Sequence, residues 1–376
     1  MTRHGAAGTL LFAGGLWLLL GALVDEVHGA IGSAAEKSPA RAASETKSSS
    51  TAGSSVVDRD RFIQEGDQQM QRGGFEAARE AYLAANTARP NDPTVLAKLA
   101  AAELKLERPP EAVRLYQRAL ELQPGYVEFR LGLARSLAGD QRFADAVREY
   151  ESILQEDPTS YLALLGAAQT CGWAGEYERA VDFFERLLAQ HADSLEGLLG
   201  LASTLAWSDQ FDRAMETYAR VLKIDPGNKE AKIGLARVYG WKGELDKAKS
   251  AYEELIREKP NDRILLVDYA KILAWQEEYE RSIQIYERVL LDDPGNLDAK
   301  LGLARVYAWD GDLDRAEKLY DEILEDQPEN RQAVMGKIQV LHWGGRPLGA
   351  SNSAAANKPG REDTSSPAPR PNPQRP

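Results

Sequence analysis

A proline recurs every 34 residues along most of this chain, and this period constrains the fold more than any other feature. Ala192 breaks the series, whose members are Pro90, Pro124, Pro158, Pro226, Pro260, Pro294 and Pro328. Such a period is typical of stacked repeats, because each repeat is too small to bury its own apolar face and relies on its neighbours. A stack of this kind presents a long curved surface, which favours binding over catalysis.

Other residues keep the same phase when each repeat is counted so that its proline is position 32. Position 8 is small in every repeat: Gly66, Ala100, Ala134, Ala168, Ala202, Ala236, Ala270 and Ala304. Position 20 is also small: Ala78, Ala112, Ala146, Ala180, Ala214, Ala248, Ser282 and Ala316. Position 24 is aromatic: Tyr82, Tyr116, Tyr150, Phe184, Tyr218, Tyr252, Tyr286 and Tyr320. Small residues let two helices approach closely, and an aromatic ring fills the space beside them. Each repeat is therefore predicted to be a hairpin of two helices.

The last complete repeat, residues 297–330, shows where the two helices begin and end. Gly311 interrupts the first apolar helical pattern, and Asp312 is placed to cap the second helix through its side-chain oxygen. Pro328 marks the end of the second helix, because its ring cannot continue the hydrogen-bond ladder.

This pattern resembles the tetratricopeptide repeat family, whose signature is a small residue at position 8, Ala at 20, an aromatic at 24 and Pro at 32. The resemblance covers residues 58–343 and implies an all-α fold, a right-handed superhelical α-solenoid of stacked helix-turn-helix hairpins. Residues 331–343 repeat only a first helix and are expected to cap the array. The eight complete repeats start near residues 59, 93, 127, 161, 195, 229, 263 and 297.

The two ends of the chain differ from the array. Residues 1–30 have the layout of a secretory signal, with Arg3 before an apolar run and small residues suited to cleavage near Gly29 to Ala35. The apolar run is also about long enough to remain as an uncleaved membrane anchor. Both alternatives place the repeats outside the cytoplasm, in the periplasm or beyond. Residues 31–57 are expected to be a disordered linker, and residues 344–376 a disordered, proline-rich tail.

Composition argues against several classes of function. The formal net charge is −12 and no basic stripe is present, so nucleic acid is not an expected partner. Cys171 is the one cysteine, which excludes an internal disulfide and a cysteine-based metal site. No nucleophile, base and orienting group recur at a motif spacing, and no phosphate-binding glycine loop precedes a helix. We therefore expect that the chain is not an enzyme and that it has no catalytic residues, cofactor or metal.

Candidate binding residues lie on the first helices, where the resemblance implies that positions 2, 9 and 13 line a concave groove. Position 13 forms a tryptophan ladder: Trp173, Trp207, Trp241, Trp275 and Trp309, with Trp343 in the cap. Position 9 adds cations: Arg135, Arg237, Lys271 and Arg305. Aromatic planes and guanidinium groups suit an extended peptide or sugars. A second interpretation is packing, because glycine at position 6 and small residues at position 12 suggest a slot for each indole.

Three functional hypotheses remain open. The first is an extracytoplasmic scaffold that binds protein partners in cell-envelope assembly or secretion, in line with a weaker resemblance to periplasmic repeat regions of bacterial exopolysaccharide secretion and outer-membrane systems. The second is a polysaccharide chaperone that binds glycans with the tryptophan ladder. The third is an accessory subunit that positions an enzyme. In each case the membrane is contacted only through the N-terminal apolar segment, if it is not cleaved.

Overall fold

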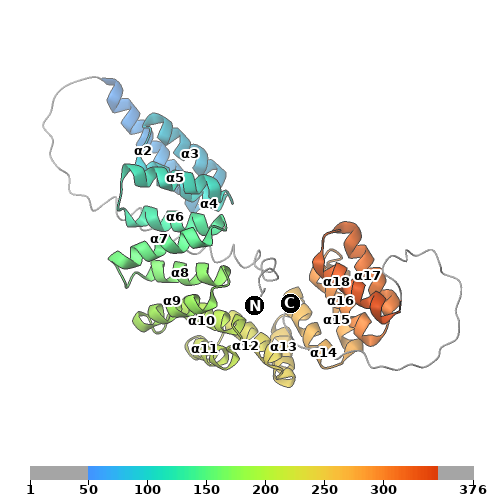
Figure 1. Ribbon diagram of the computed structural model, residues 1–376. Coiled ribbons are helices and arrows are strands. Elements are labelled where there is room, and N and C mark those ends of the chain that lie inside the picture. Colours follow the sequence, from blue (N-terminus) through green and yellow to red (C-terminus); the bar gives the residue numbers. More distant parts are fainter. Residues whose placement is uncertain (1–49, 346–376) are drawn as a thin grey trace, which may run out of the picture. The chain divides into compact units, whose positions relative to one another are not determined.

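The computed structural model describes residues 50–345, where the regular structure consists of α-helices and no strands. The signal or anchor expected at residues 1–30 and the tail from residue 346 lie outside the described residues. Within the described part, no helix is both long enough and apolar enough to cross a membrane. The predicted all-α class is confirmed, and consecutive helices form the predicted hairpins (Figure 1).

The described helices fall into two compact units that divide after Ser208, and the first unit contains nine of these helices. Its helices are α2 Ser50–Gln71, α3 Phe75–Ala88, α4 Pro93–Lys105, α5 Pro109–Leu122, α6 Val127–Gly139, α7 Phe143–Glu156, α8 Tyr161–Trp173, α9 Tyr177–Gln190 and α10 Leu195–Trp207. Even-numbered helices are the first helices of their repeats, and odd-numbered helices are the second.

The second unit contains the remaining eight described helices. They are α11 Phe211–Ile224, α12 Lys229–Lys242, α13 Leu245–Glu258, α14 Arg263–Trp275, α15 Tyr279–Asp292, α16 Leu297–Asp310, α17 Leu313–Asp326 and α18 Arg331–Trp343. The terminal helix α18 is the capping helix that the sequence predicts at residues 331–343.

Helix α2 begins at Ser50, inside the segment that the sequence predicted to be a disordered linker. The prediction of a disordered linker over residues 31–57 is therefore wrong for residues 50–57, whereas residues 31–49 lie outside the described part of the chain. A helix extends readily beyond a packed core, because adding a residue to an existing helix needs no new nucleus.

The turn inside each hairpin depends on one residue with a left-handed backbone at position 15. Glycine fills this position in half of the eight repeats, and Gly311 has φ 89° at the end of α16, which confirms the predicted break. Other repeats force a larger residue into the same conformation, as at Glu107 with φ 59°. The turn is therefore set by backbone geometry that glycine adopts most easily.

Most first helices, but not α6 or α8, are capped by the side chain at position 34 of the preceding repeat. Asn228, Asn296 and Asn330 each accept a backbone N–H three residues on, at 3.0 Å. Second helices mostly lack a side-chain cap, but Asp312 accepts the backbone N–H of Arg315 at 3.1 Å, as predicted. These side chains satisfy amide groups that the first helical turn leaves unpaired.

The core follows the repeat positions. Every residue at position 20 is completely buried, and in the seventh repeat Ser282 Oγ donates a 2.7 Å hydrogen bond to the carbonyl oxygen of Ala270 at position 8. Where position 6 of the next repeat is glycine, the aromatic ring at position 24 packs on it. A Cβ placed on Gly132 would lie 2.3 Å from Cζ of Tyr116, so this site accepts no side chain. This close contact locks each repeat to the next one.

Candidate binding groove

The tryptophans at position 13 are half-buried, each at the end of a first helix. They are Trp173, Trp207, Trp241, Trp275 and Trp309, with Trp343 at the end of α18. The indole of Trp275 packs over α12, where a Cβ on Gly240 would stand 3.3 Å from Cζ3 of the indole. Trp309 and Trp343 likewise pack against the core of the second unit, and Trp173 against that of the first. Each of these indoles thus combines core packing with exposed area.

These contacts correct one part of the packing interpretation. The glycines at position 6 were expected to form the slot for the indoles, but they receive the tyrosine or phenylalanine rings of position 24 instead. At Gly240 the small residue at position 12 faces the indole of the next repeat, as expected. Tyrosine reaches position 6 because position 24 lies on the second helix that packs against the next first helix.

Arg135 does not belong to an accessible binding surface. Its side chain is on α6 and the residue is only 2% exposed, which makes it one of the largest buried side chains of the structure. Burial raises the pKa of Tyr150 to about 12 and also raises that of Tyr116, and the charge of Arg135 opposes both shifts. The charge of Arg135 therefore acts on buried tyrosines of two adjacent repeats. The prediction that it contacts a partner is corrected, because a ligand cannot reach a side chain enclosed in this way.

Arg237 and Lys271 converge on a carboxylate that the sequence reasoning did not single out. Asp268 on α14 accepts from Arg237 Nε on α12 at 2.8 Å and from Lys271 Nζ at 3.1 Å. The Asp268 side chain is 12% exposed, whereas the two cations are about 40% exposed. Burial alone would raise the pKa of Asp268, but Lys271 and Arg237 outweigh it and hold this pKa below its ordinary value.

The sequence does carry a signal for Asp268. It stands at position 6, where all the remaining repeats from the third onward, and also α18, have glycine. In this one repeat a carboxylate replaces the glycine. It lies near Tyr252, and burial together with the negative charge of Asp268 raises the pKa of that tyrosine. The two predicted cations are therefore brought together by a third residue that completes their charge pairing.

Arg305 is the most accessible cation of position 9. It is exposed on α16, in contrast to the buried Arg135 at the equivalent place on α6. Burial raises the pKa of Tyr320, and a hydrogen bond from Arg305 opposes this shift. In the second unit the helices α12, α14 and α16 thus carry accessible cations beside half-buried indoles. We call this surface the second-unit groove, and its residues are Arg237, Trp241, Lys271, Trp275, Arg305 and Trp309.

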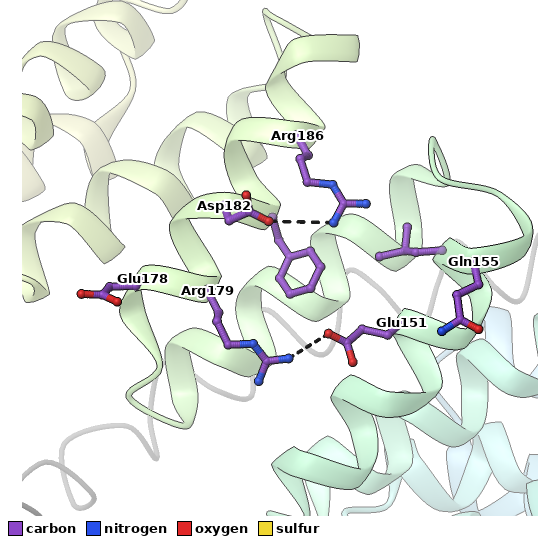
Figure 2. A pocket seen from close by; sticks show the side chains of 8 residues that line it. Glu151, Gln155, Glu178, Arg179, Asp182 and Arg186 are labelled. Atoms are coloured by element: carbon purple, nitrogen blue, oxygen red, sulfur yellow. Dashed lines mark hydrogen bonds and ion pairs between the residues drawn. The ribbon is translucent and has the colours of Figure 1, made fainter.

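A separate hollow lies between the second helices α7 and α9 (Figure 2). It measures about 650 Å³ and has Phe183 among its lining residues. Arg179 pairs with Glu151 across the two helices at 2.8 Å, and the guanidinium of Arg186 lies 5.4 Å from the ring centre of Phe183. The rim charges are therefore largely engaged with one another. The hollow includes none of the predicted binding residues.

A second hollow, of about 630 Å³, surrounds the turn between α9 and α10. Its Ser194 and His191 are not arranged for nucleophilic catalysis, because the Ser194 oxygen accepts the Gly197 backbone N–H at 3.1 Å as a helix cap. The Tyr161 hydroxyl lies 3.0 Å from the same oxygen, and its ring meets His191 edge-on. The cluster is thus explained by capping and ring packing.

Comparisons with known proteins agree with this architecture. Two family models, both described as tetratricopeptide repeat, match the chain. One matches residues 63–127 and 97–161, and the other matches residues 137–205, 174–223, 205–267 and 273–338. These matches span well over half of the chain, which therefore belongs to the tetratricopeptide repeat family. Repeats of this family mediate protein–protein interaction, and proteins built from them are generally non-catalytic scaffolds that bind protein or peptide partners.

Several solved structures are similar to parts of this chain at low sequence identity. A tetratricopeptide repeat protein from Parabacteroides merdae has a TM-score of 0.53 at 16% identity, covering 76% of this chain and 99% of its own. The PilF protein of Pseudomonas aeruginosa has a TM-score of 0.48 at 20% identity, covering 59% and 99%. The C-terminal part of a repeat protein from Cytophaga hutchinsonii has a TM-score of 0.49 at 15% identity, covering 64% and 99%. No curated protein sequence matches the chain significantly.

Proposed function

We propose that this chain is an extracytoplasmic scaffold that binds an extended segment of a protein partner in the second-unit groove. The observation that carries the proposal is the pairing of accessible cations with half-buried indoles on α12, α14 and α16. An indole that is already half-packed loses little freedom on binding and still offers an apolar plane. Three cations at one-repeat spacing suit acidic side chains that alternate with apolar ones in the partner.

The proposed location rests on the N-terminal sequence. Arg3 precedes an uncharged apolar run that ends before Asp25, the order of segments in a secretory signal or anchor. A scaffold exported in this way meets envelope or secreted proteins. We therefore place its partners in cell-envelope assembly or secretion, where an accessory role beside an enzyme is one form of the same binding function.

Crosslinked pull-down from intact cells tests the binding proposal. We compare the unmodified chain with an Arg305→Ala variant and with a Lys318→Ala variant, which removes an exposed cation from α17 outside the groove. We expect Arg305→Ala to weaken capture of specific partners by about tenfold, the effect of one charge-assisted hydrogen bond, and Lys318→Ala to leave it unchanged. Equal capture by all three proteins would reject the groove.

The tryptophans separate protein partners from glycans. A Trp241→Ala, Trp275→Ala double variant, first shown by circular dichroism to remain folded, is compared with Leu291→Ala, which removes an 83% exposed apolar side chain from α15. Loss of protein partners only in the double variant supports the proposal. Quenching of tryptophan emission by soluble oligosaccharides, without loss of protein partners, would favour a polysaccharide chaperone instead.

A further inference from the structure

Helix α14 differs from its two neighbours in the second-unit groove at two positions of one helix face. Positions 2, 6, 9 and 13 lie on the same face, because each is about one or two helical turns from the next. At position 2 α14 has Ile264, where α12 and α16 have the carboxylates Glu230 and Asp298. At position 6 it has Asp268, where both neighbours have glycine. The carboxylate of this face is thus moved by one turn on α14, toward the cations of position 9.

Asp268 uses both of its carboxylate oxygens inside the groove. Its Oδ2 accepts a hydrogen bond from Arg237 Nε at 2.8 Å and also lies 2.8 Å from Arg237 Nη2, while its Oδ1 accepts from Lys271 Nζ at 3.1 Å. Glu230 is a second carboxylate near Arg237: burial raises the pKa of Glu230, and the charge of Arg237 opposes this shift. On α12 and α14 the two cations of position 9 are therefore balanced by two carboxylates of the same face.

Arg305 on α16 is in a different situation. Its side chain is exposed, and no carboxylate of the described residues forms an ion pair with it. Its hydrogen bond to Tyr320 engages an uncharged partner, because burial raises the pKa of that tyrosine. A guanidinium has five N–H donors and pairs well with a carboxylate. An acidic side chain of a partner therefore meets an available cation at Arg305.

The groove over α14 offers apolar contact instead of charge. Ile264 is 65% exposed. Single exposed apolar residues are common on protein surfaces, but this one stands where both neighbouring helices have a carboxylate. The half-buried indoles Trp241 and Trp275 lie on the same face of α12 and α14. Covering these side chains with apolar groups of a partner removes apolar area from water, which favours binding.

We propose that Asp268 sets the specificity of the second-unit groove, so that a partner segment places apolar side chains over α12 and α14 and an acidic side chain at Arg305 on α16. A partner carboxylate at Arg237 or Lys271 has to displace Asp268 and loses the charge-assisted hydrogen bonds already made there. The same carboxylate at Arg305 displaces no internal ion pair. This inference rests on the proposed binding function of the groove and adds the chemistry and placement of the partner side chains.

Two fluorescein-labelled peptides measure this specificity. One alternates glutamate with leucine, and the other has glutamine in place of every glutamate. The ratio of their affinities for the chain, measured by fluorescence anisotropy, gives the acid preference. A variant that is partly unfolded binds both peptides less, so destabilisation alone leaves the ratio unchanged. We expect the unmodified chain to prefer the glutamate peptide about tenfold, and Arg305→Ala to lose this preference.

Asp268→Asn and Asp268→Gly release Arg237 and Lys271, and the glycine variant restores the residue that neighbouring repeats have at position 6. We expect either change to increase the acid preference about tenfold further, and the preference to survive when Arg305→Ala is added to the same chain. Glu325→Gln is the control for net charge, because it removes an exposed carboxylate from α17 outside the groove. It should leave the preference unchanged.

The possible failures can be told apart. If both Asp268 variants keep the acid preference of the unmodified chain while Arg305→Ala lowers it, the role of Asp268 is overturned and the groove remains the binding surface. An increase in preference with Glu325→Gln that equals the increase with Asp268→Asn also overturns it, because net charge then explains both. If the unmodified chain binds neither peptide, this inference fails together with the proposed function of the groove.

Discussion

The ring of Tyr116 lies directly on Gly132 of the next repeat, where a Cβ would come within 2.3 Å of Cζ. The same contact recurs between Tyr150 and Gly166 at 2.4 Å, because the repeat period brings identical positions together. The glycines of position 6 are therefore fixed by a neighbouring side chain and not by backbone conformation.

Replacing Gly132 with Ala should destabilise the first unit by about 1–3 kcal/mol, because the methyl group overlaps a buried ring that has no free space to move into. Urea unfolding followed by circular dichroism measures the change. Gly172→Ala on α8 is the control, since the nearest atom to its Cβ is Thr204 Oγ1 at 3.9 Å. We expect the control to be neutral or slightly stabilising, as alanine favours helix over glycine. Equal losses in the two variants would contradict the contact.

Replacing Glu107 with Gly should stabilise the turn between α4 and α5 by about 1 kcal/mol, because φ of 59° strains any residue with a Cβ. The thermal unfolding midpoint should rise accordingly. The reciprocal change at Gly175, which has φ 76°, to Ala should lower the midpoint. A fall with Glu107→Gly would mean that the Glu107 side chain stabilises the turn.

Replacing Asp268 with Asn should destabilise the second unit by about 1–3 kcal/mol at neutral pH, because it weakens charge-assisted bonds to Arg237 and Lys271. The pKa of Asp268 is lowered in the folded state from its ordinary value of 3.8, so its charge contributes stability above that pH. The difference between wild type and variant should therefore be constant near neutrality and shrink as pH falls below about 4. Unfolding midpoints measured at several pH values check this dependence, which a pH-independent difference would contradict.

Cys171 should resist thiol reagents in the folded protein. It is completely buried on α8, and burial raises the pKa of its thiol to about 12. At pH 8 the thiolate that reacts is therefore scarce as well as inaccessible. Labelling should proceed only as fast as the first unit opens, and Gly132→Ala should accelerate it. Rapid labelling without added denaturant would show that α8 is less well packed than the structure indicates.

Much of the fold follows from the sequence by simple periodicity. The prolines at position 32, the small residues at 8 and 20 and the aromatic at 24 predict hairpins whose bounds agree with the structure, including the turn at Gly311 and the cap at Asp312. This success has a physical cause. In a stack of repeats each residue meets only its own and adjacent repeats, so local spacing already specifies most contacts.

The candidate site depended on tertiary structure. Arg135 and Arg305 share position 9, yet the first is buried and the second is exposed, because burial is set by the side chains of neighbouring repeats. Asp268 became part of the charge cluster only when α12 and α14 packed together and brought Arg237 within 2.8 Å. The sequence by itself determined the period, the helices and their order in the stack. Tertiary structure decided which of the repeated side chains are enclosed and which remain available to a partner, because accessibility depends on packing between helices and not on position within one.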